Sequence, residues 1–221
     1  MDISNKRHII TTKDGSHSLM VPELNEQYHS IHGAQQEAEH VFLKMGLDYF
    51  EKDHLAVFEV GFGTGLNTLL SCLWGRRNNV SLDYTSVEKY PVSAKEANQL
   101  NYGELVEQPE LFNQLHTCDW EQKVDVTKDF SLSKLKLDLT KDELPRGFDV
   151  IFFDAFAPNK QPKLWTIEVF EKMYAILNEG GVLVTYCCQG EAKRTMLKAG
   201  FKVEKVPGPP GKREMLRAVK C

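Results

Sequence analysis

The stretch Phe58–Asn67, FEVGFGTGLN, decides the fold of this chain. It completes a short apolar run, Ala56–Gly61, which predicts a buried strand that ends at a glycine. A helix is predicted directly after the turn, because the segment LNTLLSCLWGRR from Leu66 has apolar residues at helical spacing, with Gly75 as its expected end. A strand, a glycine-rich turn and a helix in this order form the first unit of a doubly wound α/β sheet.

The remainder of the chain alternates strands with helices in the same way. Further strands are predicted at Ser81–Glu88, Phe130–Leu139, Gly147–Phe156 and Val182–Cys188, helices at Pro91–Asn101, Leu164–Gly181 and Glu191–Gly200, and an antiparallel pair at Phe201–Gly208 and Arg213–Val219. A polar, mostly helical connection extends to about His116. This alternation predicts an α/β fold with a mostly parallel, doubly wound sheet and an antiparallel C-terminal strand pair. Ligands of such sheets bind outside the carboxyl ends of the strands.

The composition is ordinary for a soluble globular protein, with 42% hydrophobic and 26% charged residues in 221. No apolar run reaches the roughly 18 residues that a membrane-spanning helix needs. The start of the chain, MDISNKRHIITTKDGSHS, lacks the apolar region of a secretory signal, and the five cysteines show no C-x-x-C spacing. We therefore expect one domain over residues 1–221, in the cytoplasm, with reduced thiols.

The net charge of −4 is unevenly distributed. Residues 189–221 carry nine lysines and arginines against three acids, so this tail has a net charge of +6 and the rest of the chain −10. A basic tail on an acidic body is typical of an edge that faces phosphate groups, although a solvated face has the same composition.

The glycine turn indicates a ligand without phosphate. A triphosphate loop has the pattern GxxxxGK[ST], and no lysine follows the glycines here; a dinucleotide loop has GxGxxG. The spacing of Gly61, Gly63 and Gly65, with Glu59 before them, instead resembles the first motif of Rossmann-like methyltransferases that use S-adenosylmethionine. Glu88, at the end of the next strand, suits the ribose hydroxyls because a carboxylate accepts hydrogen bonds from two vicinal hydroxyls at once.

A second motif, FFDAFAPNKQPKLWT over Phe152–Thr166, follows the strand that ends near Asp154. An acid followed by aromatic residues and proline resembles the DPPY-type motif of amino-group methyltransferases. Asp154 can orient an amine by accepting a hydrogen bond from it. Whether Asp154 also takes the proton is open, because an unperturbed aspartate is a weak base near neutral pH.

The combination of GFGTGLN, DAFAP, LWT, a GG pair before a strand and the closing GKREML resembles the methyl-transferring domain of the bacterial enzyme that completes 5-methylaminomethyl-2-thiouridine at the tRNA wobble position. His17–Leu43 is similar to the N-terminal segment of that family, so residues 1 to about 50 are expected to be an extension that contributes to the substrate entrance. The resemblance runs from about Gly15 to Val219. In bifunctional members a flavin-dependent oxidase domain follows; this chain ends at Cys221, and a stand-alone methyltransferase is expected.

The resemblance also implies roles for individual residues. Those expected to bind the cofactor, S-adenosyl-L-methionine, are Glu59, Gly61, Gly63, Gly65, Asn67, Glu88, Asp138 and Asp154, with Glu88 at the ribose, Asp138 at the adenine amino group and Asp154 also beside the reacting amine as the catalytic residue. Those expected at the substrate are Tyr28, Ser30 and Glu37 in the entrance, Pro158 and Trp165 in the pocket wall, and Lys212 and Arg213 near the nucleic acid. Asp142 is a rival of Asp138 for adenine, and a place for Trp120 in the cofactor pocket is open.

No metal site is predicted, because His29 and His32 are three residues apart without a third ligand placed by spacing. Cys187 and Cys188 are expected to be inert thiols in a buried strand. The expected function is methylation of the aminomethyl group of 5-aminomethyl-(2-thio)uridine in tRNA, with a separate enzyme supplying that precursor. The alternatives are methylation of another amine on a small molecule or protein, aminopropyl transfer, and a non-catalytic nucleic-acid-binding module, against which the intact acids Glu59, Glu88 and Asp154 argue.

Overall fold

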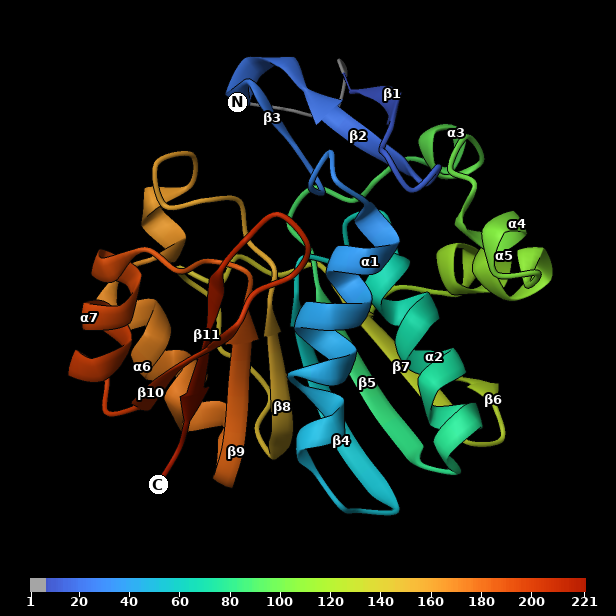
Figure 1. Ribbon diagram of the computed structural model, residues 1–221. Coiled ribbons are helices and arrows are strands. Elements are labelled where there is room, and N and C mark those ends of the chain that lie inside the picture. Colours follow the sequence, from blue (N-terminus) through green and yellow to red (C-terminus); the bar gives the residue numbers. More distant parts are fainter. Residues whose placement is uncertain (1–6) are drawn as a thin grey trace.

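The computed structural model describes residues 7–221, which alternate strands with helices (Figure 1). The strands are β1 (His8–Thr11), β2 (His17–Val21), β3 (Glu26–Gln27), β4 (His54–Val60), β5 (Ser81–Val87), β6 (Lys123–Thr127), β7 (Phe130–Leu135), β8 (Phe148–Phe153), β9 (Leu177–Thr185), β10 (Lys202–Pro207) and β11 (Glu214–Val219). The α-helices are α1 (Ala34–Ala38), α2 (Leu66–Asn78), α3 (Ala94–Ala97), α4 (Tyr102–Leu105), α5 (Pro109–Thr117), α6 (Ile167–Ile176) and α7 (Gly190–Lys198). A π-helical segment, Glu39–Lys44, continues α1, and three 3₁₀ segments lie at Pro22–Leu24, Leu47–Tyr49 and Pro162–Leu164.

Eight of the strands form one sheet with the order β10-β11-β9-β8-β4-β5-β7-β6. The pairs β9–β8, β8–β4, β4–β5 and β5–β7 are parallel, whereas β10–β11, β11–β9 and β6–β7 are antiparallel. The predicted mostly parallel sheet with an antiparallel C-terminal pair is therefore confirmed. None of the helices in residues 7–221 combines the length and the apolar character that crossing a membrane requires.

Helices cover both faces of this sheet (Figure 1), and β8 shows why its sequence is continuously apolar. Phe152 packs against Phe42 on the face that α1 and α2 cover, while Phe153 packs against Trp165 and Phe170 on the opposite face. Successive side chains of a strand point to opposite faces, so a strand covered on both sides needs apolar residues at every position.

The strands β1, β2 and β3 form a small antiparallel sheet above the edge where β4, β5 and β8 end (Figure 1). It is joined to the rest of the chain by polar contacts: the backbone N–H of His17 donates to Oδ1 of Asn101 at 2.8 Å, and Nζ of Lys160 donates to the carbonyl of Leu24 at 2.7 Å. The expected N-terminal extension thus contains a sheet that the sequence analysis did not anticipate. Its residues 1–6 lie outside the described part of the chain.

Two predictions that relied on glycine as a helix end were wrong. Gly75 lies inside α2, which continues to Asn78 and ends where Asn79 takes a left-handed conformation. Gly180 and Gly181 lie within β9, because the chain leaves α6 at Ile176 and pairs with β8 from Leu177 onward. Tertiary strand pairing, which a local pattern does not contain, decided the second case.

Other boundaries also moved. The helix expected from Pro91 begins only at Ala94, where Ser93 and Glu96 form a reciprocal capping box. The strand expected over Phe130–Leu139 ends at Leu135. It pairs with β6, a strand that the sequence analysis did not predict. Cys187 and Cys188 follow the end of β9 rather than lying in it, and Cys188 is exposed.

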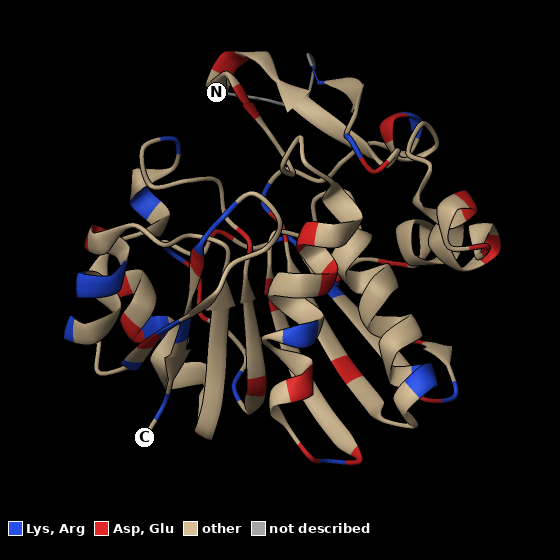
Figure 2. Ribbon diagram, viewed as in Figure 1, with Lys and Arg blue, Asp and Glu red and all other residues tan. Residues whose placement is uncertain are grey.

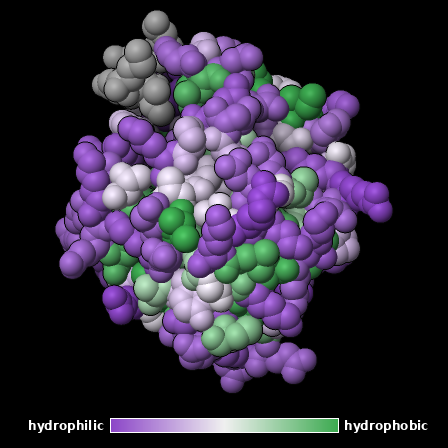
Figure 3. Space-filling view, turned by 90° about the vertical axis from the view of Figure 1, so that its left-hand side faces the viewer, coloured by the Kyte–Doolittle hydropathy of each residue, from purple (hydrophilic) through white to green (hydrophobic). Residues whose placement is uncertain are grey.

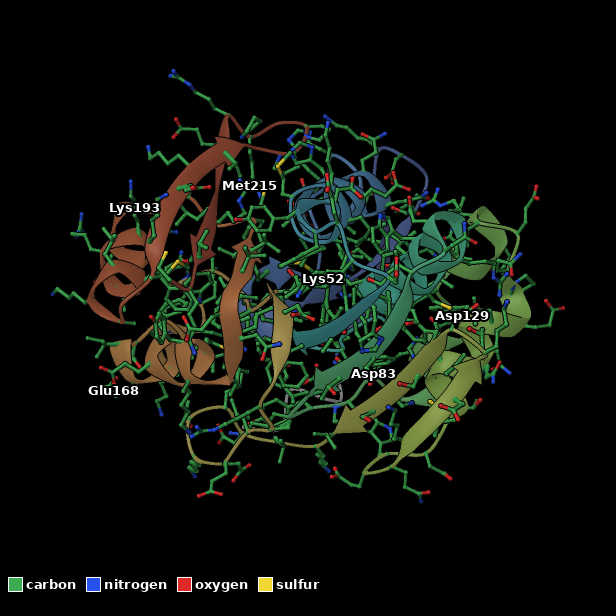
Figure 4. All side chains as sticks on the ribbon, turned by 90° about the horizontal axis from the view of Figure 1, so that it is seen from below. Lys52, Asp83, Asp129, Glu168, Lys193 and Met215 are labelled. Atoms are coloured by element: carbon green, nitrogen blue, oxygen red, sulfur yellow. The ribbon has the colours of Figure 1, made fainter. Side chains whose placement is uncertain are left out.

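Asp149 ties the lower ends of three neighbouring strands together. Its carboxylate accepts hydrogen bonds from the backbone N–H of Ala56 at 3.0 Å, from Nζ of Lys52 at 2.8 Å and from Nδ2 of Asn178 at 3.1 Å. Figure 4, seen from below, shows Lys52 on this side of the sheet. Burial alone would raise the pKa of Asp149, but the hydrogen bonds from Ala56, Lys52 and Asn178 outweigh it and hold the pKa below its ordinary value.

We predict that Asp149→Ala lowers the free energy of unfolding at pH 7 by about 1–3 kcal/mol, the scale of a hydrogen bond to a charged group. A group with a lowered folded-state pKa stabilises the fold above its unfolded pKa and loses that effect as the pH falls through the folded pKa. The gap between wild type and variant should therefore close on acidification below about pH 4. Urea unfolding at several pH values measures it, and a gap that does not change with pH would contradict the assignment.

Candidate active site

A cavity of about 600 Å³ opens where β4, β5 and β8 end. The small N-terminal sheet lies above this edge of the large sheet (Figure 1). The loops after these strands, the loop after β7 and the N-terminal segment all contribute to its wall. The lining residues that bear on its chemistry are Tyr28, His29, Gly61, Gly63, Asn67, Glu88, Asp138, Asp154 and Phe156. Its size is within the range of pockets that hold small molecules and cofactors.

The glycine turn approaches its neighbours so closely that a side chain at either of two of its glycines would crowd them. Gly63 has φ of 51°, and a Cβ there would lie 3.2 Å from the ring of Tyr28. Gly65 has φ of 75°, and a Cβ would lie 2.8 Å from Nε2 of His116. Both the left-handed backbone and the close packing favour glycine. Gly63 faces the cavity, whereas Gly65 turns against His116 and does not line it.

A buried lysine holds the outer side of this turn. Nζ of Lys134, on β7, donates to the carbonyls of Leu115 and His116 at 2.9 and 2.8 Å and lies 5.2 Å from the ring centre of Phe62 within the turn. The ring of His116 in turn contacts the carbonyl of Thr64 at 3.1 Å. The turn is thus fixed from β7 and α5. The ring of Trp120 contacts Phe62 and Lys134 on this outer side and does not line the cavity.

Glu88 projects from the end of β5 into the cavity with its carboxylate held by the backbone. Oε2 accepts a hydrogen bond from the N–H of Gly63 at 3.2 Å and Oε1 accepts one from the N–H of Tyr90 at 2.8 Å. Asp138 also lines the cavity and is paired with Lys89 at 2.8 Å. Its rival Asp142 accepts the backbone N–H of Asp138 at 2.7 Å and does not line the cavity. Of the two, Asp138 is therefore the one placed to meet a ligand.

Asp154 follows β8 directly and is half-buried in the cavity wall. Its Oδ2 accepts a hydrogen bond from Nδ2 of Asn67, at the start of α2, at 2.9 Å. Burial raises the pKa of Asp154 to about 7, and the Asn67 hydrogen bond only partly opposes it. A carboxyl with this pKa can give or take a proton near neutral pH, which the sequence alone did not indicate.

Glu59, by contrast, does not line the cavity. It is fully buried on β4, one layer behind the turn, and accepts hydrogen bonds from Thr68 and Ser86. The structure therefore does not bring it to the cavity with the other residues expected at the cofactor.

The residues expected at the substrate lie in separate places. Tyr28 lines the cavity and packs edge-on against Phe156. Glu37 accepts the backbone N–H of Ser30 at 2.9 Å and Nζ of Lys212 at 2.7 Å, which joins the N-terminal segment to the loop between β10 and β11 outside the cavity. The other three do not line the cavity: Arg213 is exposed, Pro158 is half-buried, and Trp165 is buried and donates to the carbonyl of Phe156 at 2.8 Å.

His29 is a cavity residue that was considered only as a metal ligand. Its ring lies 3.1 Å from Oγ of Ser18, and burial lowers its pKa to about 4, so the imidazole is neutral at physiological pH. In residues 7–221 no three His, Cys, Asp or Glu side chains come together in a way that suits a metal ion. A lone histidine in a mostly polar segment gives no signal of its place in the fold, and only the tertiary structure reveals it.

The cavity suits S-adenosylmethionine, a cofactor with a cationic sulfonium and an amino group but no phosphate. Its wall carries the carboxyl groups of Glu88, Asp138 and Asp154, and the glycine turn leaves backbone exposed beside them. Apolar residues of β4, β5 and the loop after β7 supply flat contacts for an adenine ring. Glu88 would hold the ribose hydroxyls, Asp138 the adenine amino group, and Asn67 and Gly63 the methionine part.

Comparison with known proteins also indicates an S-adenosylmethionine-dependent methyltransferase. A family model described as "S-adenosyl-L-methionine-dependent methyltransferase" matches residues 93–221, more than half of the chain. The tRNA 5-methylaminomethyl-2-thiouridine biosynthesis bifunctional protein MnmC of Nitrosospira multiformis is 31% identical over 220 residues, which cover 90% of this chain and 35% of that protein. The protein of the same name from Paraburkholderia xenovorans is 29% identical over 212 residues, covering 88% of this chain and 32% of that protein.

The chain therefore spans about a third of the length of these curated relatives. Among solved structures, MNMC2 from Aquifex aeolicus is similar with a TM-score of 0.72 and 26% sequence identity, covering 96% of this chain and 70% of that chain.

We predict that Glu88→Ala weakens binding of S-adenosylhomocysteine, the demethylated cofactor, by roughly 1–3 kcal/mol, because the ribose loses a hydrogen bond to a charged group. Isothermal calorimetry measures the affinity. Glu121→Ala is the matched control, since Glu121 also accepts a backbone N–H, that of Lys136, but lies outside the cavity. Equal affinities of a folded Glu88→Ala variant and wild type would remove Glu88 from the site.

Proposed function

Because the chain belongs to the family of S-adenosyl-L-methionine-dependent methyltransferases, we propose that it methylates the aminomethyl group of 5-aminomethyl-(2-thio)uridine at the wobble position of tRNA. The names of the MnmC relatives support the tRNA substrate. In this proposal residues 1–221 act as one methyl-transferring domain in the cytoplasm, and a separate enzyme supplies the aminomethyl precursor.

The observation that carries the proposal is the place of Asp154. It lies at the edge of the sheet where the glycine turn ends, in the wall of the cavity, with a pKa near 7. Asn67 occupies its Oδ2, while Oδ1 has no hydrogen-bond partner among residues 7–221. One carboxylate oxygen is thus available to an acceptor amine, and the other is fixed by the protein.

When bound, S-adenosylmethionine supplies a methyl group whose bond to the sulfonium sulfur breaks with the electron pair staying on sulfur. The chain's own residues orient the acceptor. Asp154 accepts a hydrogen bond from the amine N–H at Oδ1 and thereby aims the nitrogen lone pair at the methyl carbon. Once the new C–N bond has formed, the nitrogen carries one proton more than the neutral product, and the Asp154 carboxylate accepts that proton and passes it to water.

Basic side chains on the C-terminal part of the chain suit the phosphates of tRNA. Lysine and arginine gather on α7 and the adjoining strands (Figure 2), and Figure 4 shows Lys193 on the outer side of α7. The side of the molecule that α6 and α7 form is mainly hydrophilic, with separate hydrophobic areas (Figure 3). Arg213 is exposed beside this region, whereas Lys212 is already paired with Glu37, so Arg213 is the freer of the two for a phosphate.

We predict that Asp154→Asn lowers single-turnover methylation of tRNA by about 10²-fold or more, the range for a lost positioning or acid–base group, while the affinity for S-adenosylhomocysteine is kept. Because the pKa of Asp154 is raised to about 7, the wild-type carboxyl is protonated below that pH, and its rate should rise as the pH increases through 7.

The variant should lack this rise but keep the one that belongs to the substrate amine. Mass spectrometry of tRNA nucleosides measures the product at each pH. Wild-type rates of Asp154→Asn throughout the pH range would end the candidacy of Asp154, and a methyl group on no tRNA nucleoside with wild-type enzyme would end the proposed substrate.

We predict that Arg213→Ala reduces the slope of log affinity for tRNA against log salt concentration by about 1, the contribution of one phosphate contact. Arg77→Ala is the matched control, because Arg77 is also exposed but lies in the last turn of α2, away from the cavity. Filter binding at several salt concentrations gives both slopes. A slope for Arg213→Ala equal to that of the control would mean that the basic tail is a solvated face.

A further inference from the structure

Glu59 has surroundings that are unusual for an ionised carboxylate. The side chain is fully buried on β4. Its Oε2 accepts hydrogen bonds from Oγ of Ser86 at 2.7 Å and from Oγ1 of Thr68 at 3.1 Å. Its Oε1 is also buried and has no hydrogen-bond partner among residues 7–221. One half of the carboxyl group is therefore satisfied and the other half is not.

Within residues 7–221, no lysine or arginine pairs with Glu59 to offset a charge at this position. The groups that act on Glu59 come from α2 (Asn67, Thr68), from β5 (Tyr84, Ser86) and from the end of β8 (Asp154). All are neutral hydroxyl or amide groups except Asp154, which is itself acidic. An isolated buried carboxylate is costly, and such a group normally takes up a proton instead. Burial is the largest of the effects that raise the pKa of Glu59 to about 8.

Asn67 links Glu59 to the cavity. Its side chain lies beside the carboxyl group of Glu59, and its Nδ2 donates a hydrogen bond to Asp154 at 2.9 Å. Its Oδ1 is buried and has no hydrogen-bond partner in the described part of the chain. Two carboxyl groups this close to one neutral amide cannot both be ionised without strong repulsion, and the charge of Asp154 acts on Glu59. Asp154 faces the cavity, whereas Glu59 is sealed behind the turn, so the negative charge is more stable on Asp154.

We propose that Glu59 is a positioning residue that acts as the neutral acid: it fixes the side chain of Asn67, and through Asn67 the carboxylate of Asp154, without touching the cofactor. This rests on the proposed role of Asp154 in the reaction. It differs from the expectation that Glu59, the acid before the glycines, binds the cofactor. The motif position then needs the shape and hydrogen bonds of a carboxyl group rather than its charge.

Substitution of Glu59 separates shape from charge. Glu59→Ala should lower the affinity for S-adenosylhomocysteine by about tenfold or more, because Asn67 loses its support. Glu59→Gln, which has the shape of the neutral acid, should restore the affinity to within about threefold of wild type. Glu88→Gln is the matched comparison on the neighbouring strand and should lose affinity, because the Glu88 carboxylate lines the cavity.

Calorimetry with S-adenosylhomocysteine gives these affinities without any methylation step, so the result is independent of the tRNA substrate. A Glu59→Gln variant that binds as weakly as Glu59→Ala would show that the charge is needed and would overturn the proposal. A Glu59→Ala variant with wild-type affinity would overturn it equally, because no positioning role would remain.

Thermal stability provides a second readout. A folded-state pKa above the ordinary value of 4.5 means that the folded chain holds a proton that the unfolded chain releases, so wild type should lose stability as the pH rises from about 4.5 to about 8. Glu59→Gln lacks this loss, and its melting temperature relative to wild type should rise steadily over that range. Asp154 also has a raised pKa and destabilises both proteins as the pH rises, so its contribution cancels in the difference between their melting temperatures.

A difference in melting temperature that is constant with pH would contradict the neutral form of Glu59. If the variants fail to fold, ¹³C NMR of wild type with labelled glutamate carboxyls decides the matter. One glutamate should titrate near pH 8, and titration of every glutamate at ordinary values would overturn the proposal.

Discussion

The parallel register of β4, β5 and β8 is the constraint on which the rest of this structure depends. These strands run in the same direction, so their carboxyl ends lie side by side. Residues at these ends are therefore neighbours in space although they are far apart in the sequence; Glu59 and Asp154, for example, are 95 positions apart. Glu88 and Asp154 thereby reach one cavity together with the glycine turn. One apolar core on each face of the sheet packs against these strands.

The acids that line the cavity differ in their partners and in their pKa values. Three acids line the cavity, Glu88, Asp138 and Asp154, and each has a partner that fixes its direction: Glu88 has backbone N–H groups, Asp138 has Lys89 and Asp154 has Asn67. Lys89, Lys141, Lys160 and Lys163 line the same cavity, so its wall carries charges of both signs. Two of these acids differ in their pKa values. The hydrogen bond from Lys89 is the main cause that lowers the pKa of Asp138 to about 2, whereas burial raises that of Asp154 to about 7. The first stays ionised, and the second can exchange a proton.

Much of the fold followed from the sequence because its signals are local and repeated. The strand before Gly61, the apolar run that ends at Asp154 and the antiparallel C-terminal pair all appear in the structure with small shifts of their ends. What could not be predicted depends on contacts between distant segments. The small N-terminal sheet and the clamp that Lys134 forms on Phe62 have no local signature.

The same distinction holds for the candidate site. The motifs predicted that Glu88, Asp154 and Asn67 lie at one site, and all three line the cavity. They also predicted a cofactor contact for Glu59, which is instead fully buried behind the turn. A sequence pattern records which residue types stand at which positions. It does not record which of two acids faces solvent, and that decides whether a carboxyl group binds by charge or supports by shape.

The claim at the centre of this account is that Asp154 is a carboxyl group whose pKa lies close to neutral. ¹³C NMR titration of the protein with labelled aspartate carboxyls, saturated with S-adenosylhomocysteine, measures it directly, and the Asp154→Asn variant assigns the resonance. We expect one aspartate signal to titrate near pH 7 and to be missing from the variant. A signal for Asp154 that titrates near pH 4, like an ordinary exposed aspartate, would contradict the account.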